Sequence, residues 1–420
     1  MKIIHLNTYD GHGIGGAAVL RLNKSLKQLG ANSVAICLHK FDAQPNVKAI
    51  SGTILGRVKA TLSTFAERYL SKALVKRTKI GFSAQRFGCA VVQNPLIKNA
   101  DVIHIHWIND GFLSPKFLAQ LDELEKPIVW TFYDSSAFTG GCHDHQGCEH
   151  YHKECGLCPM LKISGKNDFS HQTWLRKKKA YSELNCHIVA SDNLIAGAVK
   201  LSSLMGFREV TMIPNSIATN VFKPYLKTEA KKVLKISPDK FVVMIGSMSF
   251  QDDIFSDRSY LMEALNDLAS RPGLDKGEIE LVVLRNKTNV EFPFKTTFLG
   301  EISNDEHLAK CYSAADIFLV SSVTEQLPNG VIESLSCATP VVAFKKGEVQ
   351  QMIKHLENGY LAECGSTEDL ATGVEWLYHD ENTPDIQKEA RRMILTEFSE
   401  PVIAEKHLLL YQSLIDLQPK

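Results

Sequence analysis

The chain lacks an excess of either charge, and it lacks any apolar run of membrane-spanning length. Its 420 residues carry 47 Lys and Arg against 47 Asp and Glu, so its formal net charge is zero. This balance argues against a nucleic-acid-binding protein that is held by bulk electrostatic attraction. The apolar stretch at the start, Met1 to Leu6, is too short and too soon interrupted for a signal peptide. We therefore expect a cytoplasmic protein without a transmembrane helix.

Cysteine is not scarce, and its pattern indicates thiol or metal chemistry. Ten cysteines in a cytoplasmic chain favour free thiols or a metal site over disulfides. Four of them lie close together in one short segment: Cys142, Cys148, Cys155 and Cys158. The last two have the C-x-x-C spacing of a metal knuckle, and four thiolates could close a tetrahedral structural zinc site. Neighbouring histidines are alternative ligands, and free thiols or a redox pair are the competing interpretation.

The length and the first elements predict a doubly wound α/β domain followed by a second domain. Lys2 to Asn7 is an apolar strand, Ala17 to Leu29 is an amphipathic helix, and Ser33 to Leu38 is a second strand. The glycine-rich segment before the helix ends in Gly15 and Gly16, and glycines let the backbone approach a phosphate or a sugar closely. The pattern is not G-x-G-x-x-G with a downstream acid, so a dinucleotide site is a weak hypothesis. A plain turn is the other interpretation of these glycines.

A second unit of strand, loop, helix and strand lies in the C-terminal half. Ile317 to Val320 is a short buried strand, Val331 to Ala338 is a helix, and Val341 to Phe344 is the next strand. Pro328 suits the first turn of the helix, because its missing N–H would have no intrahelical partner there. In parallel sheets such a loop lies at the carboxyl end of a strand, where ligands bind.

The start of this helix predicts an anion site. The N–H groups of Asn329, Gly330 and Val331 would face the crevice, with the helix dipole behind them. Glu333 sits one turn further into the helix, and Glu325 sits on the loop. Two carboxylates beside an anion site suit a ligand that has both phosphates and hydroxyls, such as a nucleotide-sugar. In the alternative interpretation Glu325 caps the helix and Glu333 is a solvated surface charge.

The segment from Val320 to Tyr360 resembles part of the retaining glycosyltransferases of family 4. Glu325 and Glu333, with seven residues between them and Ala-Thr-Pro-Val-Val-Ala after them, are similar to the E-x7-E signature of that family. Asn358-Gly359-Tyr360-Leu361 resembles its usual continuation. The resemblance implies that Glu333 holds the ribose hydroxyls of a nucleotide-sugar and that Glu325 contacts the transferred sugar.

The N-terminal half resembles the bacterial surface-polysaccharide branch of the same family. Gly15-Gly16-Ala17-Ala18 is similar to its G-G-A-A loop, and residues 130–143 are similar to its W-T-x-H-D-x-x-A-F-T-G-G-C-H segment. Tyr133 stands where that segment usually has a histidine that contacts the donor sugar, so the resemblance places Tyr133 at the sugar. A tyrosine hydroxyl can donate a hydrogen bond, but it cannot act as an imidazole does near neutral pH. This departure implies either an altered choice of sugar or weakened activity.

A second departure concerns the diphosphate. Relatives carry an R-K-G stretch after the first strand of the second domain, and its basic residue grips the diphosphate. In this chain residues 250–258 contain three acids and no lysine, and Arg258 is their only cation. A diphosphate without a cation depends on a helix dipole that contributes about 0.3–1 kcal/mol at exposed sites. Both departures motivate an alternative function, in which a catalytically weak or silent relative binds a glycan or a partner transferase.

The resemblance covers nearly the whole chain and implies an α/β protein of the GT-B class, with two Rossmann-like doubly wound domains facing across a cleft. We expect an acceptor-side domain at residues 1–205, with residues 186–191 as its last strand and a Cys-rich loop at 142–158. A nucleotide-sugar-binding domain follows at 206–395, and a helix at 396–420 crosses back to the first domain. The implied activity is transfer of a hexose or related sugar to a glycan or lipid-linked glycan with retention of anomeric configuration, in the synthesis of surface polysaccharide such as lipopolysaccharide. No catalytic metal is expected.

Residues 52–82 form a basic amphipathic segment. Seven Lys and Arg oppose one acid, Glu67, and apolar residues recur at helical spacing. Such a helix can lie on an anionic membrane surface, which would suit a lipid-linked acceptor and a peripheral position at the inner face of the membrane. It can equally pack its apolar face on the core and leave a solvated basic face.

Overall fold

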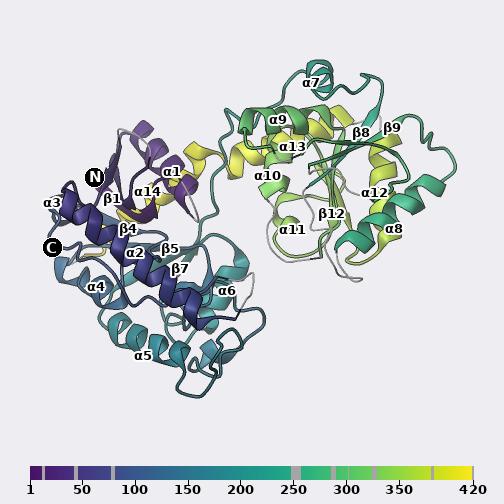
Figure 1. Ribbon diagram of the computed structural model, residues 1–420. Coiled ribbons are helices and arrows are strands. Elements are labelled where there is room, and N and C mark those ends of the chain that lie inside the picture. The colour runs from purple at the N-terminus through teal and green to yellow at the C-terminus, as the bar shows by residue number, and fades with distance from the viewer. Residues whose placement is uncertain are drawn as a thin grey trace. The chain divides into compact units, whose positions relative to one another are not determined.

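The chain divides into two compact units, and each of them is built around one parallel β-sheet (Figure 1). The computed structural model describes residues 1–11, 15–41, 46–76, 81–246, 257–284, 290–300, 302–323, 329–379 and 383–418. The N-terminal unit comprises Met1–Ser216 together with Ile403–Lys420, and the C-terminal unit comprises Ile217–Val402.

Seven parallel strands form the sheet in the described part of the N-terminal unit, in the order β3-β2-β1-β4-β5-β6-β7. They are β1 (Lys2–Tyr9), β2 (Asn32–His39), β3 (Val47–Ala49), β4 (Val102–Ile105), β5 (Ile128–Phe132), β6 (Cys186–Ala190) and β7 (Val210–Met212). The strand order reverses between β1 and β4, which is where doubly wound sheets bind ligands, beyond the carboxyl ends of the strands.

The predicted end of the first sheet was wrong. Residues 186–191 were expected to be its last strand, but β7 pairs with β6 in parallel, with Ile188 opposite Val210. The expected boundary at 205/206 therefore precedes β7, whereas the two units meet at Ser216 and Ile217. The strand was missed because it has three residues and sits at the edge of the sheet, so its short, partly exposed sequence carries little apolar signal.

Helices cover both faces of this sheet, as expected where parallel strands are buried on both sides. The helices of the unit are α1 (Gly16–Gln28), α2 (Ile54–Leu74), α3 (Pro95–Lys98), α4 (Pro115–Ala119), α5 (Phe169–Tyr181), α6 (Asn193–Leu201) and α14 (Glu400–Asp416). Local capping explains where several begin: Asp168 accepts hydrogen bonds from the N–H groups of Ser170 and His171 at the start of α5. The chain returns to this unit through α14, whose Ile403 and Tyr411 pack in one cluster with Ile3 of β1.

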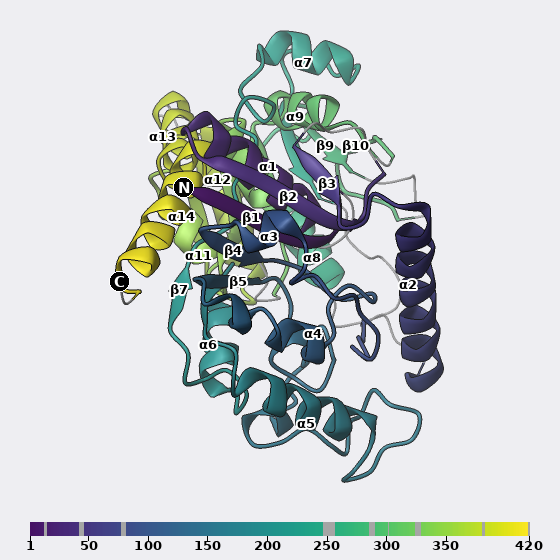
Figure 2. The ribbon, with the colours of Figure 1, turned by 90° about the vertical axis from the view of Figure 1, so that its left-hand side faces the viewer.

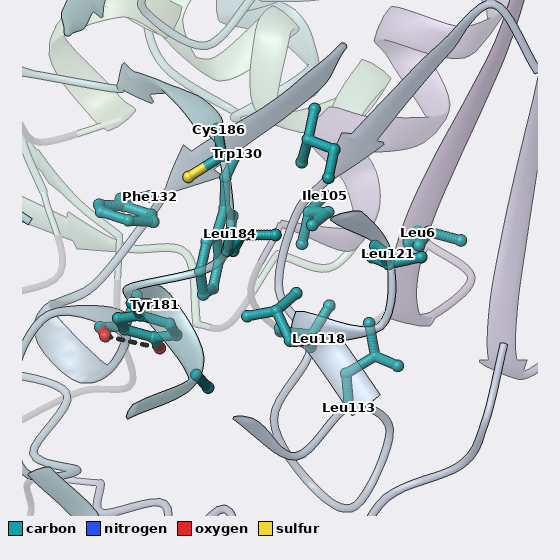
Figure 3. Close-up of a cluster of buried hydrophobic side chains, with 14 of the residues drawn as sticks. Leu6, Ile105, Leu113, Leu118, Leu121, Trp130, Phe132, Tyr181, Leu184 and Cys186 are labelled. Atoms are coloured by element: carbon teal, nitrogen blue, oxygen red, sulfur yellow. Dashed lines mark hydrogen bonds between the residues drawn. The ribbon is translucent and has the colours of Figure 1, made fainter. Parts of the chain in front are cut away.

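The main core of the N-terminal unit lies between the sheet and the helices around α4 and α5, and Figure 3 shows its central side chains. The Trp130 ring meets Phe132 and Tyr181 edge to face, with centroids 5.0 and 5.7 Å away. The Tyr181 hydroxyl is buried with them and donates a hydrogen bond to the carbonyl of Ala137 at 3.0 Å. The core thus anchors the segment that follows β5, where Tyr133 lies.

The C-terminal unit repeats the architecture with six parallel strands among its described residues, in the order β10-β9-β8-β11-β12-β13. They are β8 (Phe241–Ile245), β9 (Ile279–Val283), β10 (Lys295–Phe298), β11 (Ile317–Val320), β12 (Val341–Phe344) and β13 (Gly359–Ala362). Its helices are α7 (Lys227–Val233), α8 (Asp257–Ser270), α9 (Asp305–Ala314), α10 (Asn329–Ser336), α11 (Val349–Met352), α12 (Thr367–His379) and α13 (Thr383–Glu397). The order reverses between β8 and β11, and α10 follows β11.

Helix α2 turns its apolar side chains outward, and it lies on the outside of the N-terminal unit in both views (Figure 1, Figure 2). The residues exposed on it are Ile54, Leu55, Val58, Leu62, Phe65 and Tyr69. Ala60, Thr64 and Glu67 are buried instead, and the Glu67 carboxylate accepts the N–H groups of residues 85–87. The interpretation in which the apolar face packs on the core is therefore wrong. Helical spacing shows that such a face exists but not which way it points.

No helix in the described ranges of the chain is both long and apolar enough to span a bilayer.

Candidate functional site

The anion site predicted in the C-terminal unit lies at the first turn of α10. Asn329 begins this helix and is exposed, Gly330 is half-buried, and Val331 is fully buried. The first N–H groups of a helix have no intrahelical acceptor and carry the positive end of its dipole, so this turn can bind an anion through its backbone. Glu325 and Pro328 fall outside the described residues, so the role expected for Glu325 stays a prediction.

Gly330 suits the close packing of this turn, where a side chain would press on its neighbours. A Cβ atom there would lie 3.0 Å from the Tyr312 hydroxyl of α9 and 3.0 Å from Cζ of Phe318 in β11. The rings of Tyr312 and Phe318 meet edge to face, with centroids 5.4 Å apart. A glycine therefore lets the start of α10 sit directly against α9 and β11, at the carboxyl end of the strand.

Glu333 is held by a partner that the sequence did not predict. The Tyr312 hydroxyl donates a hydrogen bond to Oε2 of Glu333 at 3.0 Å, and Glu333 is half-buried one turn into α10. Burial and the neighbouring carboxylate raise the pKa of Tyr312 well above its usual value, so the hydroxyl keeps its proton. The interpretation of Glu333 as a freely solvated charge does not fit this contact. The sequence does not reveal this hydrogen bond, because Tyr312 lies on α9 and Glu333 on α10, and only the packing of the two helices brings the residues together.

Arg258 lies in the first turn of α8, which packs against α12. Most of the acidic stretch that precedes it, residues 247–256, falls outside the described residues. The expected contact between Arg258 and a diphosphate therefore stays a prediction.

In the N-terminal unit the structure brings together Gly15, Gly16 and Tyr133. Gly15 precedes α1 with φ of 74°, a left-handed conformation that favours glycine. A Cβ atom at Gly15 would lie 2.9 Å from Cε2 of Tyr133, and one at Gly16 would lie 2.9 Å from the carbonyl carbon of Gly11. The Tyr133 ring thus lies directly on the glycine turn, as expected if both belong to one site. Residues 12–14 of the turn fall outside the described residues.

The Tyr133 hydroxyl is not free to point at a ligand in the way expected. It is hydrogen-bonded to Nδ1 of His106 at 2.9 Å, and Nε2 of His106 is 2.9 Å from Nδ1 of His5. His104 stacks beside His106 with ring centroids 3.9 Å apart, and His407 of α14 lies 5.4 Å from His104. The signal for this cluster was present in the sequence, because histidines interrupt otherwise apolar strands that are buried on both faces.

Burial keeps these four imidazoles neutral. It lowers the pKa of His5 to about 3 and that of His407 to about 4, and it lowers the pKa values of His104 and His106 well below 6.5. Charging any of them would place an uncompensated cation in the core, and the other histidines of the cluster would add to the penalty. The cluster is therefore a network of neutral donors and acceptors around Tyr133.

The four cysteines of the predicted metal loop line one small cavity of about 20 Å³, together with His145 and His150. The Cys155 sulfur accepts the Gly140 N–H at 3.0 Å, and the Cys142 thiol donates to Oγ1 of Thr139 at 3.4 Å. Burial raises the pKa values of the Cys142 and Cys155 thiols to about 12. The donor set suits zinc, since four thiols and two imidazoles converge on one space.

The cysteine sulfurs are nevertheless not gathered closely enough for a metal site, because no three of them lie within 4.8 Å of one another. Among the described residues, the group whose ligand atoms all lie within 4.8 Å of one another is His5, His104 and His106, and not the cysteines. A tetrahedral site with Zn–S bonds of about 2.3 Å would need the thiols to move closer together. The predicted zinc site therefore stays a prediction.

Comparison with known proteins finds a family model that matches part of the C-terminal unit. Residues 228–394 match the family model described as glycosyl transferases group 1. Of the curated relatives, N-acetyl-alpha-D-glucosaminyl L-malate synthase of Bacillus anthracis is 25% identical over 136 residues, which are 32% of this chain and 35% of that protein. The lipopolysaccharide core biosynthesis glycosyltransferase LpsE of Rhizobium meliloti is 24% identical over 221 residues, 51% of this chain and 62% of that protein. The resemblance to glycosyltransferases is thus confirmed at the level of this group.

A third relative is the alpha-galactosylglucosyldiacylglycerol synthase of Streptococcus pneumoniae, which is 26% identical over 206 residues, 48% of this chain and 53% of that protein. The chain spans less than two thirds of the length of each of these three relatives. The matched parts therefore establish a shared group and not a shared substrate.

Solved structures confirm the fold. The sucrose-phosphate synthase of Thermosynechococcus elongatus superposes with a TM-score of 0.58 at 16% identity, over 99% of this chain and 100% of that chain. Anabaena HepE in complex with UDP superposes with a TM-score of 0.59 at 16% identity, over 98% of this chain and 100% of that chain. The predicted α/β class with two Rossmann-like doubly wound domains of the GT-B type is therefore correct.

The buried histidines predict that the N-terminal unit loses stability in mild acid. In the unfolded chain they titrate near pH 6.5, whereas in the folded unit their pKa values lie about 2 units lower or more. The unfolded chain therefore binds more protons below about pH 6.5. Each histidine is expected to lower the free energy of unfolding by up to about 1.4 kcal/mol per pH unit, down to about pH 4.

Urea unfolding followed by tryptophan fluorescence measures this loss, because three of the four tryptophans, Trp107, Trp130 and Trp174, lie in this unit. His407→Leu should reduce the dependence on pH by about one titrating group, and His307→Gln, at an exposed site in the other unit, should not. A free energy of unfolding that is the same near pH 7.5 and near pH 5 would contradict the burial argument.

Proposed function

We propose that the protein moves a sugar from a nucleotide-sugar donor to a glycan or lipid-linked glycan, because its residues 228–394 match the family model of the glycosyl transferases of group 1. One observation carries the proposal: the start of α10, whose first N–H groups have no acceptor within the helix, lies one turn from Glu333, whose carboxylate accepts a hydrogen bond from Tyr312. A helix start recognises phosphate, and an oriented carboxylate accepts hydrogen bonds from a pair of sugar hydroxyls. Anabaena HepE, which has this fold, was solved with UDP.

The proposed roles follow from this geometry. The backbone at Asn329, Gly330 and Val331 binds the diphosphate, and Glu333 holds the ribose hydroxyls. Glu325, which precedes α10 in the sequence, orients the transferred sugar. Because Tyr312 holds one oxygen of Glu333, the carboxylate is ordered before the ligand arrives, which lowers the entropy cost of binding.

We propose that the transfer retains the anomeric configuration. In this mechanism the bond between the anomeric carbon and the diphosphate breaks, and the acceptor oxygen attacks from the same face. The departing phosphate oxygen takes the proton of the acceptor hydroxyl, so the protein needs no nucleophile of its own. The protein contributes electrostatic stabilisation of the leaving diphosphate, which preorganised N–H donors provide without reorganisation during the reaction.

The proposed acceptor is a growing surface polysaccharide or its lipid-linked precursor. The names of two relatives refer to such acceptors: LpsE to the core of lipopolysaccharide, and the Streptococcus pneumoniae synthase to a glycosyl diacylglycerol. A cytoplasmic position is part of this proposal, and all ten cysteines are free thiols, which suits a reducing compartment. The alternative function is that of a catalytically silent relative that binds a glycan or a partner transferase. The hydrogen bond between the Tyr133 hydroxyl and His106 supports testing this alternative too.

Glu333→Ala is expected to weaken binding of the donor about 10- to 100-fold, because a hydrogen bond to a charged group contributes about 1.5–3 kcal/mol. Tyr312→Phe should have a smaller effect of the same sign, since the carboxylate remains but is no longer oriented. A thermal-shift panel of UDP-, GDP- and ADP-sugars identifies the donor, and calorimetry then measures its dissociation constant. Glu357→Ala is the matched control, at an exposed site of the same unit.

Donor hydrolysis and transfer by the same proteins separate the enzyme from the silent relative. An active enzyme hydrolyses the donor faster than its Glu325→Ala variant, and NMR of the product shows the anomeric configuration of the donor retained. Intact donor binding with equal background hydrolysis in both proteins would establish the silent relative. If no nucleotide-sugar of the panel binds, the donor site itself is refuted.

We also propose that Cys142, Cys148, Cys155 and Cys158 hold a structural zinc ion that clamps the loop after β5. The lining of one cavity by all four thiols supports the proposal. Zinc would contribute no step of the reaction here, because four protein ligands leave no open position for water or substrate. The loop is also tied down by Lys177, whose buried ammonium group donates to the carbonyls of Ser136 and Thr139.

Protein purified without added metal is expected to contain about one zinc ion per chain. Cys148→Ser should lower the zinc content towards zero and lower the melting temperature of the N-terminal unit, because metal binding is part of the folding free energy. Cys364→Ser, an exposed thiol in the other unit, should leave both unchanged. Atomic emission of the purified proteins decides the matter, and only traces of zinc in the wild type would exclude the site.

Finally, we propose that the outward apolar face of α2 contacts an anionic lipid bilayer. Ile54, Val58, Leu62, Phe65 and Tyr69 are three or four residues apart and thus form one stripe along a helix of 21 residues. From Ile54 to Tyr69 the stripe is about 22 Å long, and an apolar stripe of this length that is exposed on a globular unit marks an interaction surface.

Charge favours a membrane as the occupant of this stripe. Four exposed basic residues accompany it, Arg57, Lys59, Arg68 and Lys72, and Arg68 pairs with Asp110. The only acid of α2, Glu67, is buried on the opposite side, where backbone N–H groups pair with it. The outer surface of the helix is therefore apolar and basic, which matches an anionic interface and suits a lipid-linked acceptor.

Replacing both Leu62 and Phe65 by Ser is expected to lower partition onto vesicles that contain phosphatidylglycerol at least about tenfold, because two buried apolar side chains are lost. Co-sedimentation measures the partition, and phosphatidylcholine vesicles should bind the wild type weakly. Leu175→Ser, an exposed leucine on α5, is the control. Concentration-dependent dimerisation without vesicle binding would show instead that a second copy of the chain covers the stripe.

A further inference from the structure

A continuous chain of buried hydrogen bonds crosses the N-terminal sheet and ends at Tyr133. It runs from Tyr133 after β5 to His106 after β4, then to His5 in β1, Ser33 in β2 and Asn23 in α1. The distance is 2.9 Å from His106 to His5, 3.0 Å from His5 to Ser33 and 2.7 Å from Ser33 to Asn23. The first four residues follow the spatial order of the strands, β5, β4, β1 and β2. Every member except the half-buried Tyr133 is at most 2% exposed.

The direction of the chain is set at its far end. The Asn23 amide nitrogen donates to the carbonyl oxygen of Asn46 at 3.2 Å, so the amide oxygen of Asn23 faces Ser33. An amide oxygen can only accept, and the Ser33 hydroxyl must therefore give its single proton to Asn23. The oxygen of Ser33 is then available to His5 only as an acceptor.

The two histidines transmit this direction. A neutral imidazole carries one proton, and each of these rings stays neutral because it is buried. His5 must place its proton on Nε2 to donate to Ser33, which leaves its Nδ1 bare. His106 then places its proton on Nε2 to donate to His5, and its own bare Nδ1 accepts the proton of the Tyr133 hydroxyl.

We infer that this chain makes Tyr133 a fixed hydrogen-bond acceptor toward its ligand and holds its ring on the glycine turn. The hydroxyl proton is committed to His106, so a ligand group that reaches the oxygen meets a lone pair and must donate. Gly15 has no side chain to separate the turn from the ring. His106, His5, Ser33 and Asn23 are thus positioning residues, and Tyr133 selects a donor group. That this group is a sugar hydroxyl rests on the proposed function, but the direction of the chain does not.

A metal ion among the same histidines would need a different arrangement of protons. Ligand atoms of His5, His104 and His106 lie within 4.8 Å of one another. However, the 2.9 Å separation between Nδ1 of His5 and Nε2 of His106 is a hydrogen-bond distance, and a metal would require both nitrogens to be bare. In the hydrogen-bonded chain, both of these nitrogens and the groups bonded to them have hydrogen-bond partners without an ion.

The direction is tested by NMR of the full-length protein with ¹⁵N-labelled histidine at neutral pH, without any ligand. The ¹⁵N shifts distinguish a protonated from a bare ring nitrogen, and spectra of single His→Gln variants assign the signals. The expected result is that His5 and His106 both carry their proton on Nε2. A proton on Nδ1 of His106 would overturn the inference, and so would a metal-shifted signal that disappears on chelation.

Asn23→Leu is expected to reverse the chain. Ser33 would then donate to His5, both histidines would carry their proton on Nδ1, and the Tyr133 proton would be released toward the ligand. Tyr133→Phe leaves the hydrogen bond between Ser33 and Asn23 in place, so His5 and His106 should both keep their proton on Nε2. Histidine signals that do not change in a folded Asn23→Leu protein would contradict control by Asn23, and the wild-type spectrum decides the direction even where this variant fails to fold.

The functional arm uses the donor found in the nucleotide-sugar panel and its singly fluorinated analogues, since fluorine can accept but cannot donate a hydrogen bond. For one position of the sugar, fluorination should raise KM of the wild type about 3- to 10-fold and leave KM of Tyr133→Phe nearly unchanged. If every analogue affects both proteins equally, Tyr133 selects no donor group. Failure of any donor to bind would instead refute the proposed function and leave the NMR result standing.

Discussion

A polar group that is buried in this protein must find a hydrogen-bond partner, and this constraint shapes each functional feature of the structure. A buried group without a partner costs about 1–3 kcal/mol, a large share of the stability of a domain. His5 and His106 meet the constraint by bonding to each other, in a chain that ends at Tyr133, and His104 meets it through Tyr411 and Thr131. Glu333 meets it through Tyr312, and the buried carboxylate of Glu67 meets it through backbone N–H groups.

The same constraint explains why α2 packs on the unit through its polar face and exposes its apolar face. Its inner face offers hydroxyls and one carboxylate to a loop whose N–H groups need acceptors, and the Thr64 hydroxyl donates to the carbonyl of Asp110 at 2.8 Å. Those polar contacts fix the helix on the unit, so the apolar residues are left on the outer side. An ordinary amphipathic helix attaches through its apolar face. In α2 the polar face attaches the helix to the unit, which leaves the exposed apolar face available to a bilayer.

The sequence predicted the strands of the fold well, because parallel strands buried on both faces read as short apolar runs between turns. β11 and β12 match their predicted bounds residue for residue, whereas the three-residue β7 was not recognised. The local structure of the candidate site was predictable where neighbours in the chain make it, as at the helix start that holds Asn329 and Glu333 and at the turn that holds Gly15. It was not predictable where packing alone makes it, because nothing in the order of residues links Tyr312 to Glu333 or Asn23 to Tyr133.

The two units therefore carry different kinds of information. The match to the glycosyl transferases of group 1 lies within the C-terminal unit, where we propose that a helix start and an oriented carboxylate hold phosphate and ribose. In the N-terminal unit a tyrosine contacts the glycine turn, and we infer that its proton is directed by Asn23 of α1, the helix that begins at this turn. A change at Asn23 would alter what Tyr133 offers to a ligand without touching the site. Specificity in such a sheet can be set from the core, where a search for residues around the ligand would not look.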